Sequence, residues 1–424
     1  MRPPIMNRKF NVCIIFAFMV MSLSCSSESS LEEQKGLVAG NRIPIELNEK
    51  SSKVAHDIKD FNSRLTASAV KTVEDQVGQN QNVVLSPLSV SMLLGMLSNG
   101  VEDDVKEEIY RYLGTRDLET LNELCNSMMT ELPNLDDLTK CRMANLFCFD
   151  NRFTLNKEFS LLLTEYYDAE ILSEDFTDTS RLLNALNSWC SKNTDGLINE
   201  IIGEKSDQSV AYLLNAMQFN SPWSGELFNQ KETKKEKFNG INGAYNVDMM
   251  ISDASNRLCA FDDNFESIFL EFGNRSFGIW ILVPQENVSI DKATELIADG
   301  ALNSIQKKAM EYPVSVHFPR LKIDVEIPLK QVLQNLGMEK LCGEFEFDIF
   351  ERRFTGMVEF EHKSSIQLDE KGAVVASASL GDIQYSYNKD PLQPYEFKVN
   401  RPFFFFIKEY STDVCVLSGL ITHP

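Results

Sequence analysis

Apolar residues recur at a helical spacing in the first half of the chain and at a strand-like spacing in the second half. Val54, Ile58, Phe61 and Leu65 lie three or four residues apart, as on one face of an α-helix, and a loop is predicted at 76–80. Helical patterns continue to about residue 130, and helical and strand-like segments then alternate to about residue 200. This order predicts a chain that begins with helices and ends with sheets.

Two segments of the first half carry polar residues where burial is expected. Residues 82–94 predict a short buried strand, a turn at Ser86-Pro87 and a helix whose first position is the proline. Farther along, the largely apolar run 211–223 has Asn215 in its middle and ends on Trp223. A buried asparagine needs hydrogen-bond partners, so Asn215 is a candidate member of a polar cluster.

Strands predominate from residue 268 onward. One helix interrupts them at 329–336 and ends at Gly337, a residue type that favours the end of a helix. The predicted strands are 268–272, 277–283, 314–318, 321–325, 358–368 and a carboxyl-terminal pair that begins at Phe403. The fold class predicted by the patterns is therefore α+β, and no internal repeat emerges.

A long interval separates the strand that ends at residue 368 from the strand that begins at residue 403. Its length of roughly 30 residues far exceeds the few that a hairpin needs. Alternate side chains in its first part are uncharged and mostly small, and would share one face of an extended strand: Ala373, Val375, Ser377, Ser379, Gly381 and Ile383. Since no proline appears before Pro391, this segment has the character of a central strand; the alternative is a surface loop of small residues.

Composition and charge exclude some classes of function. The chain has 424 residues, of which 43% are hydrophobic and 24% charged, enough for a substantial core. A net charge of −21 argues against nucleic acid as a partner, because nucleic-acid binding needs a basic face. The run 231–237 alternates lysine with glutamate and is interpreted as a solvated edge.

Motifs for catalysis and cofactor binding are absent from the sequence. No nucleophile elbow, zinc-binding helix, phosphate-binding glycine loop or dinucleotide fingerprint occurs, and the 4 histidines lack a metal-binding spacing. We therefore expect no enzyme activity, no metal and no cofactor. The cysteines beyond the amino-terminal segment are scattered, and we expect buried reduced thiols: Cys125, Cys141, Cys148, Cys190, Cys259, Cys342 and Cys415.

The amino terminus has the features of an export signal. Arg8 and Lys9 precede an apolar run at 13–20 that is too short to span a bilayer comfortably. The following Met-Ser-Leu-Ser-Cys resembles a bacterial lipoprotein signal, which implies a signal peptide at 1–24 and acylation of Cys25. The alternative is an ordinary cleavable secretory signal. Residues 25–50 are then a polar, lipid-attached tether, and 51–424 form the folded domain.

Ordered motifs after residue 50 resemble those of the serpin family across nearly the whole chain. The matching segments are Asn82 to Ser98, Leu186-Asn187-Ser188-Trp189 with Thr194-Asp195-Gly196-Leu197-Ile198, Leu214-Asn215-Ala216 to Trp223, His362 to Gly372, and Asn400-Arg401-Pro402-Phe403 with Leu417-Ser418-Gly419-Leu420. The resemblance implies three β-sheets with about nine helices, an exposed reactive loop and a metastable native state. It also implies a suicide substrate, whose cleaved loop enters the large sheet and drags the acylated protease with it.

The resemblance assigns roles to individual residues. The hinge of the loop would comprise Glu370, Gly372, Ala373, Val375, Ser377 and Ser379. A polar cluster called the shutter would lie beneath the sheet and comprise Ser86, Ser89, Asn215 and His362. Trp223 would lie at the upper opening of the sheet, called the breach.

The same resemblance places the reactive bond by counting about 17 residues from Glu370, which gives Ser386 and Tyr387, with Tyr385 as the alternative. Ala373 and Val374 replace the usual threonine and glutamate of inhibitory members.

The implied partners are target proteases of the serine class, with cysteine proteases as a further class. Elastase-like or chymotrypsin-like enzymes are favoured by the residues at the reactive bond. The alternative is a serpin-fold protein that no longer inhibits and serves as a protease substrate or binding module. We expect a monomer that is either lipid-anchored in the bacterial cell envelope, facing the periplasm or the outside, or secreted.

Overall fold

A computed structural model describes residues 41–204, 209–352, 354–360, 362–372 and 394–424. The predicted signal peptide, Cys25 and the loop positions Ala373, Val375, Ser377, Ser379, Tyr385, Ser386 and Tyr387 lie outside these residues. Within them the chain forms nine α-helices and three sheets, which confirms the predicted α+β class.

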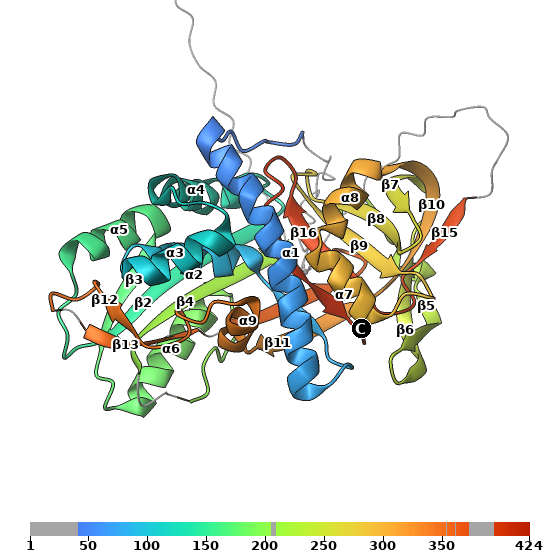
Figure 1. Ribbon diagram of the computed structural model, residues 1–424. Coiled ribbons are helices and arrows are strands. Elements are labelled where there is room, and N and C mark those ends of the chain that lie inside the picture. Colours follow the sequence, from blue (N-terminus) through green and yellow to red (C-terminus); the bar gives the residue numbers. More distant parts are fainter. Residues whose placement is uncertain (1–40, 205–208, 353, 361, 373–393) are drawn as a thin grey trace, which may run out of the picture. The chain divides into compact units, whose positions relative to one another are not determined.

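The helices are concentrated in the first half. They are α1 (Glu49–Val77), α2 (Pro87–Ser98), α3 (Asp103–Leu113), α4 (Leu118–Glu131), α5 (Lys157–Tyr167), α6 (Thr179–Asn193), α7 (Ile290–Ala298), α8 (Ala301–Lys308) and α9 (Leu329–Leu336), with short 3-10 turns at Leu132–Asn134 and Gln230–Glu232. Figure 1 shows the long blue helix α1 passing between the teal helices α2–α4, with the green helix α5 beyond them, and the orange helices α7 and α8.

The largest sheet has ten strands. Its members are β1 (Val83–Leu85), β17 (Cys415–Ile421), β16 (Phe403–Glu409), β9 (Phe277–Pro284), β8 (Phe265–Phe272), β7 (Ser255–Phe261), β10 (Met310–Pro319), β6 (Gly243–Ile251) and β5 (Lys234–Gly240), in that order, with β15 (Tyr395–Lys398) paired to β10. The lysine-rich run forms the edge strand β5, where its charges are solvated as predicted.

The other two sheets bear directly on function. Five strands run in the order β12 (Phe345–Phe347), β13 (Phe354–Phe360), β4 (Ser209–Asn220), β2 (Lys140–Asp150) and β3 (Ala169–Glu174). The third sheet pairs β11 (Leu321–Ile327) with β14 (His362–Leu368).

Local signals in the sequence are confirmed at helix boundaries. Ser86 is the N-cap of α2, and its side chain accepts a hydrogen bond from the Ser89 amide, with Pro87 at the first helical position. Gly337 ends α9 with φ of 102°, in the left-handed region that glycine adopts without a steric penalty.

Several strands were not predicted, among them β5, β6, β7 and β15. β15 begins within the interval where the sequence indicates no strand before Phe403, and it pairs in parallel with β10, opposite Val314 to His317. Its four residues are too few to show a period, and the partner strand lies far away in sequence.

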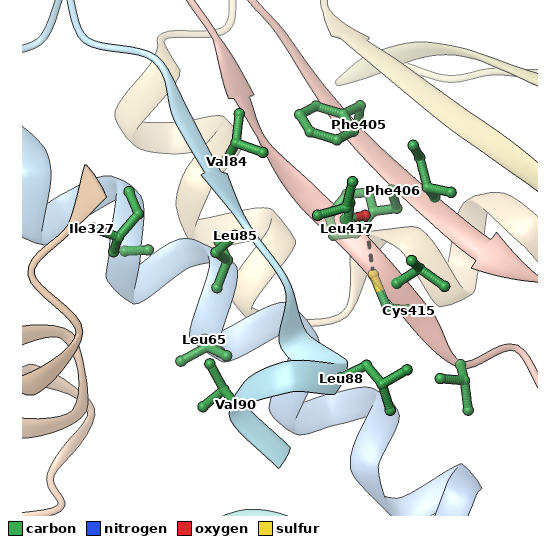
Figure 2. Close-up of a cluster of buried hydrophobic side chains, with 14 of the residues drawn as sticks. Leu65, Val84, Leu85, Leu88, Val90, Ile327, Phe405, Phe406, Cys415 and Leu417 are labelled. Carbon is green, nitrogen blue, oxygen red and sulfur yellow. Dashed lines mark hydrogen bonds between the residues drawn. The ribbon is translucent and has the colours of Figure 1, made fainter. Parts of the chain in front are cut away.

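The main core lies between the helices and the ten-stranded sheet. Figure 2 shows side chains from β1, α2, β16 and β17 meeting there, among them Leu85, Leu88 and Phe406, which are at most 7% exposed. Burying a large apolar side chain contributes about 1.5–3 kcal/mol, so this cluster stabilises the contact between the first and last parts of the chain.

The segment just before α1 packs against the body, although the sequence assigns residues up to 50 to a polar tether. Ile45 is buried, and its amide donates to Ser411 Oγ over 2.9 Å. The Arg42 guanidinium lies 3.6 Å from the centroid of the Tyr410 ring and pairs with Glu271. Ile43, Ile45 and Leu47 recur at a spacing of two, but three positions are too few to distinguish a packed segment from a tether.

Candidate functional site

The chain from 354 to 368 changes its partner halfway along. β13 pairs in parallel with β4, with Met357 opposite Ser209 and Phe360 opposite Leu213. Beyond residue 361 the chain continues as β14, which pairs with β11 from His362 to Leu368. One extended stretch therefore belongs first to the five-stranded sheet and then to the two-stranded one.

This change of partner leaves two strand edges open among the described residues. The part of β4 beyond Leu213, from Leu214 to Asn220, pairs only with β2 in the described part of the chain. β14 likewise pairs only with β11 there. We call the space between these two edges the open lane. Unpaired strand edges present backbone donors and acceptors that another strand can bind.

A tight turn closes the upper end of the open lane. Asp369 and Gly372 exchange two backbone hydrogen bonds of 3.0 Å, so the chain reverses over Glu370 and Lys371. Gly372 then forms an antiparallel bridge with Pro222, just beyond the end of β4. We call Asp369–Gly372 the hinge turn; its two end residues, Asp369 and Gly372, are antiparallel to each other.

Only glycine fits at the end of the hinge turn. Gly372 has φ of 106°, and a Cβ there would lie 2.4 Å from Ser221 O and 2.5 Å from the Trp223 amide nitrogen. Both neighbours are backbone atoms and cannot rotate away.

Trp223 holds the hinge turn from below. Its indole N–H donates to Asp369 O over 2.8 Å, and its amide donates to Lys371 O over 3.3 Å. The ring stacks on Phe272 with centroids 4.6 Å apart and is only 3% exposed. A buried indole with its polar atom satisfied is a rigid support for the turn.

An ion pair fixes the outer side of the hinge turn. Arg320 Nε lies 2.9 and 3.1 Å from the two carboxylate oxygens of Glu370, and Thr233 Oγ1 also donates to this carboxylate. Burial opposes ionisation of Glu370, but the hydrogen bonds from Arg320 and Thr233 outweigh it and lower the pKa of the carboxyl. Glu370 is therefore charged at neutral pH.

A cleft of about 1280 Å³ lies against the hinge turn. Its lining includes Trp223, Phe228, Leu368 and Lys371. The cleft leaves the outer surface of the turn accessible to solvent.

The lower end of β14 carries a neutral polar cluster. The Ser86 amide donates to His362 Nε2 over 3.0 Å, and Ser364 Oγ lies 3.0 Å from the same nitrogen. Ser89 Oγ donates to Ser86 Oγ over 2.8 Å. We call these four residues the shutter cluster; all are buried.

His362 is uncharged in this cluster. An amide can only donate, so Nε2 accepts and carries no proton. Burial lowers the pKa of His362 to about 4. Protonation at Nε2 would break the hydrogen bond from Ser86.

Asn215 lies apart from the shutter cluster in its hydrogen bonding. Its Nδ2 donates to Asn145 Oδ1 over 2.7 Å, and Asn145 Nδ2 donates to Tyr167 O over 2.7 Å. The two asparagines face each other across β2 and β4, so the amide joins the sheet to the end of α5. The structure thus brings Ser86, Ser89 and His362 together, and links Asn215 to a different set of partners.

Sequence reasoning missed three residues of this site. Arg320 has no motif around it, and Asn145 and Ser364 are ordinary polar residues in strands. Alternation offered a signal for Ser364 alone, because His362, Ser364, Ile366 and Leu368 are the buried positions of β14. Arg320 and Asn145 are identified only by pairing between distant strands.

Other chemistry is not apparent at this site. No three His, Cys, Asp or Glu side chains in the described ranges are grouped to hold a metal ion. The seven described cysteines are buried thiols that form no disulfide with one another, as predicted. Burial raises the pKa of Cys141 and Cys415 to about 12, so these thiols are protonated. Of the helices described, none is long and apolar enough to span a membrane.

Comparisons with known proteins agree on one family. The family described as "Serpin (serine protease inhibitor)" matches residues 60–424. Iripin-3 from Ixodes ricinus is 24% identical over 363 residues, covering 81% of this chain and 89% of its own. Human neuroserpin is 24% identical over 369 residues, covering 82% and 87%.

Solved structures give the same fold. The native state of tengpin, a thermophilic serpin, has a TM-score of 0.77 at 23% identity, covering 92% of this chain and 98% of its own. Thyroxine-binding globulin in complex with thyroxine has a TM-score of 0.75 at 17% identity, covering 86% and 99%. Neighbours of such low identity establish the fold alone.

Proposed function

This chain belongs to the serpin family, and we propose that it inhibits serine proteases, and cysteine proteases as a second class, by acting as a suicide substrate. The observation that carries this proposal is the open lane. In the described part of the chain, β4 and β14 run in the same direction with unpaired edges, and β14 is followed by a turn whose last residue, Gly372, is antiparallel to Asp369. A strand that continues from Gly372 would run antiparallel to both neighbours and satisfy both edges.

The chemistry of trapping begins as ordinary acyl transfer. The protease serine oxygen attacks the carbonyl carbon of Ser386, the bond to the Tyr387 nitrogen breaks, and that nitrogen takes up a proton as it leaves. The acyl-enzyme ester joins the protease to the new carboxyl end of the loop. The new amino terminus remains attached to β15.

Insertion then competes with hydrolysis of this ester. A strand along the 7 residues of β14 would form about two backbone hydrogen bonds per residue. At about 0.5–1.5 kcal/mol net for each bond, the gain is on the order of 10 kcal/mol. That free energy makes insertion effectively irreversible and carries the protease away from the loop's original position.

The loop sequence fits this role. The alternate positions Ala373, Val375, Ser377 and Ser379 are uncharged, as a buried strand face requires. Ala373 and Val374 depart from the usual hinge pattern of inhibitory serpins, but alanine is small and valine favours strands. Neither change places a charge on the face that would be buried.

The proposal predicts a covalent complex. Incubation with elastase, chymotrypsin, trypsin and subtilisin is expected to yield a species that survives SDS with at least one of them. Mass spectrometry of the released peptide is expected to locate the cut beside Ser386, with Tyr385 as the alternative. Efficient trapping of trypsin with cleavage after Lys389 would contradict the assignment of the reactive bond to Ser386 and Tyr387. The proposal that the protein is an inhibitor would be unaffected.

A matched variant tests insertion itself. Ala373→Arg places a charge on the face that must be buried, at a cost of several kcal/mol, roughly 3–5. We expect the variant to fold normally and to be cleaved as a substrate, with at least about a tenfold loss of complex per cleavage. Trapping at the parent's stoichiometry would refute insertion.

The second candidate is a serpin-fold protein that binds or is cleaved without inhibiting. The altered hinge residues Ala373 and Val374 favour it, as does the existence of the thyroxine-bound neighbour of the same fold. Thermal denaturation after proteolysis separates the candidates. A cleaved inhibitor gains large stability by insertion, whereas a simple substrate does not.

For location, we propose a lipid anchor at Cys25 that holds the protein in the bacterial cell envelope; secretion by a cleaved signal is the alternative. Each buried methylene of an acyl chain contributes about 0.8 kcal/mol to membrane binding. Cys25→Ala is expected to move the protein from the membrane fraction to the soluble fraction. An unchanged partition would contradict acylation.

A further inference from the structure

Three aromatic residues form an exposed patch at one end of the ten-stranded sheet. The Phe261 ring lies 5.3 Å from the Tyr312 ring and 5.1 Å from the Tyr395 ring, both edge to face. Phe261 is 40% exposed and Tyr395 44%, and neighbouring Met310 is 60% exposed. We call Phe261, Tyr312 and Tyr395, with Met310, the aromatic patch.

The aromatic patch is rigid because three different strands supply it. Phe261 ends β7, Tyr312 lies in β10 and Tyr395 begins β15. Burial and the nearby Glu266 carboxylate raise the pKa of Tyr395 to about 12, so its phenol is neutral. Preordered aromatic side chains lose little entropy on binding, and tyrosine is enriched among residues that dominate interface energies.

The position of the aromatic patch identifies its occupant. Tyr395 lies nine residues beyond Ser386, a separation of at most about 30 Å even for extended chain. A protease domain of about 220 residues has a radius of gyration of about 17 Å and so spans more than this distance. A protease engaged at the reactive bond therefore reaches the aromatic patch on the side of the leaving group.

One acidic residue borders the aromatic patch. Glu266 lies opposite Phe261 in the β7–β8 pairing and so shares its face of the sheet. Glu311 and Glu396 each follow a patch residue directly in a strand, so their side chains point to the other face. The aromatic patch is therefore mainly apolar and fits an apolar surface of a partner.

We propose that the aromatic patch is a secondary binding surface for the target protease, and that it selects proteases with an apolar surface on their leaving-group side. The inference rests on the proposed function, since it requires the loop to be the protease's point of attack. Contact at the aromatic patch would raise the rate of loop attack without taking part in insertion.

The test measures the second-order rate constant for loss of intact protein, whatever product forms. With a protease that cuts the loop, Phe261→Ala and Tyr395→Ala are each expected to lower this constant about 5- to 10-fold. Glu311→Gln, whose side chain lies on the other face of the sheet, is expected to leave it unchanged. Tyr410→Ala is the matched control, because Tyr410 is a similarly exposed tyrosine, at 52%. It follows β16 and lies beside Ser276, at the end of β8 and β9 that is farther from the aromatic patch.

The outcomes separate the two proposals. A lower rate constant in Phe261→Ala and Tyr395→Ala, with Tyr410→Ala unchanged, supports binding of the protease at the aromatic patch. This holds even if the parent is cleaved without trapping the protease. If Phe261→Ala and Tyr395→Ala unfold normally and their rate constants are unchanged or increased, the proposal that the protease binds the aromatic patch is wrong. This holds even if the parent traps the protease. A rate increase would indicate that the loop itself covers the aromatic patch.

Discussion

The two ends of β14 are held in opposite ways, although one short strand separates them. At its start, His362 is buried and neutral, and its partners are an amide and a hydroxyl. At its end, Glu370 is charged and paired with Arg320, which is 36% exposed. The buried end is stabilised by packing and neutral hydrogen bonds, and the outer end by an ion pair that water can reach.

This difference has a physical consequence for how the open lane would widen. This ion pair is closer to solvent than the shutter cluster, so separating it costs less because water can solvate the partly exposed Arg320 guanidinium. The shutter cluster has no such replacement, since its polar groups would lose their partners while still buried. We therefore expect separation of the strands to begin at the hinge turn and to reach the shutter cluster last.

The largest expected effect comes from the hinge turn's backbone. Gly372→Ala combines a positive φ with contacts of 2.4–2.6 Å to backbone atoms. We expect it to lower the free energy of unfolding by about 3 kcal/mol, measured by urea-induced unfolding.

Gly225→Ala is the matched control for that substitution. Gly225 also has a positive φ, 69°, but a Cβ added there would have no other atom within 4 Å. Strain alone should cost about 1 kcal/mol there. Equal effects of the two substitutions would show that the close contacts at the hinge turn contribute nothing.

The second-largest effect is expected from acidification, which should lower the free energy of unfolding through His362 at the start of β14. The pKa of His362 is about 4 in the fold against about 6.5 when exposed, so the fold favours the neutral form. This contribution is fully present above pH 6.5 and is lost as the pH falls toward 4. Between pH 7 and pH 5 the loss is about 2 kcal/mol.

The measurement compares the pH dependence of unfolding in two variants. His362→Gln keeps an acceptor for the Ser86 amide but does not titrate, so its stability should fall by less between pH 7 and pH 5. His56→Gln, at an exposed position of α1, should retain the parent's slope. The same slope in His362→Gln would exclude this histidine as the source.

The smallest effect is expected at the ion pair. A double-mutant cycle of Glu370→Gln and Arg320→Met should give a coupling of about 1 kcal/mol, because Glu370 is largely buried and Arg320 is not. The Lys53–Asp57 pair on α1, where the lysine is 74% exposed, should give less than about 0.5 kcal/mol. A coupling at Glu370 no larger than this would remove the distinction between the hinge turn and an ordinary surface pair.

Several features of the molecule could be predicted because they depend on neighbours in the chain. The helix that starts at Pro87, the helix that ends at Gly337 and the buried alternation of β14 all follow from local backbone preferences. The uncharged alternate positions from Ala373 to Ser379 are likewise a property of the sequence itself.

Which residues and strands contact one another was decided by the tertiary structure alone. Arg320 meets Glu370 across 50 positions, and Asn215 meets Asn145 across 70, because two strands lie in one particular register. β15 forms only because β10 offers an edge to it. A period in the sequence specifies which face of a strand is buried, but not which strand lies beside it, since pairing energy depends on groups that are distant in sequence. The open lane is of this second kind: it arises where β14 pairs with β11 and leaves the edge of β4 free.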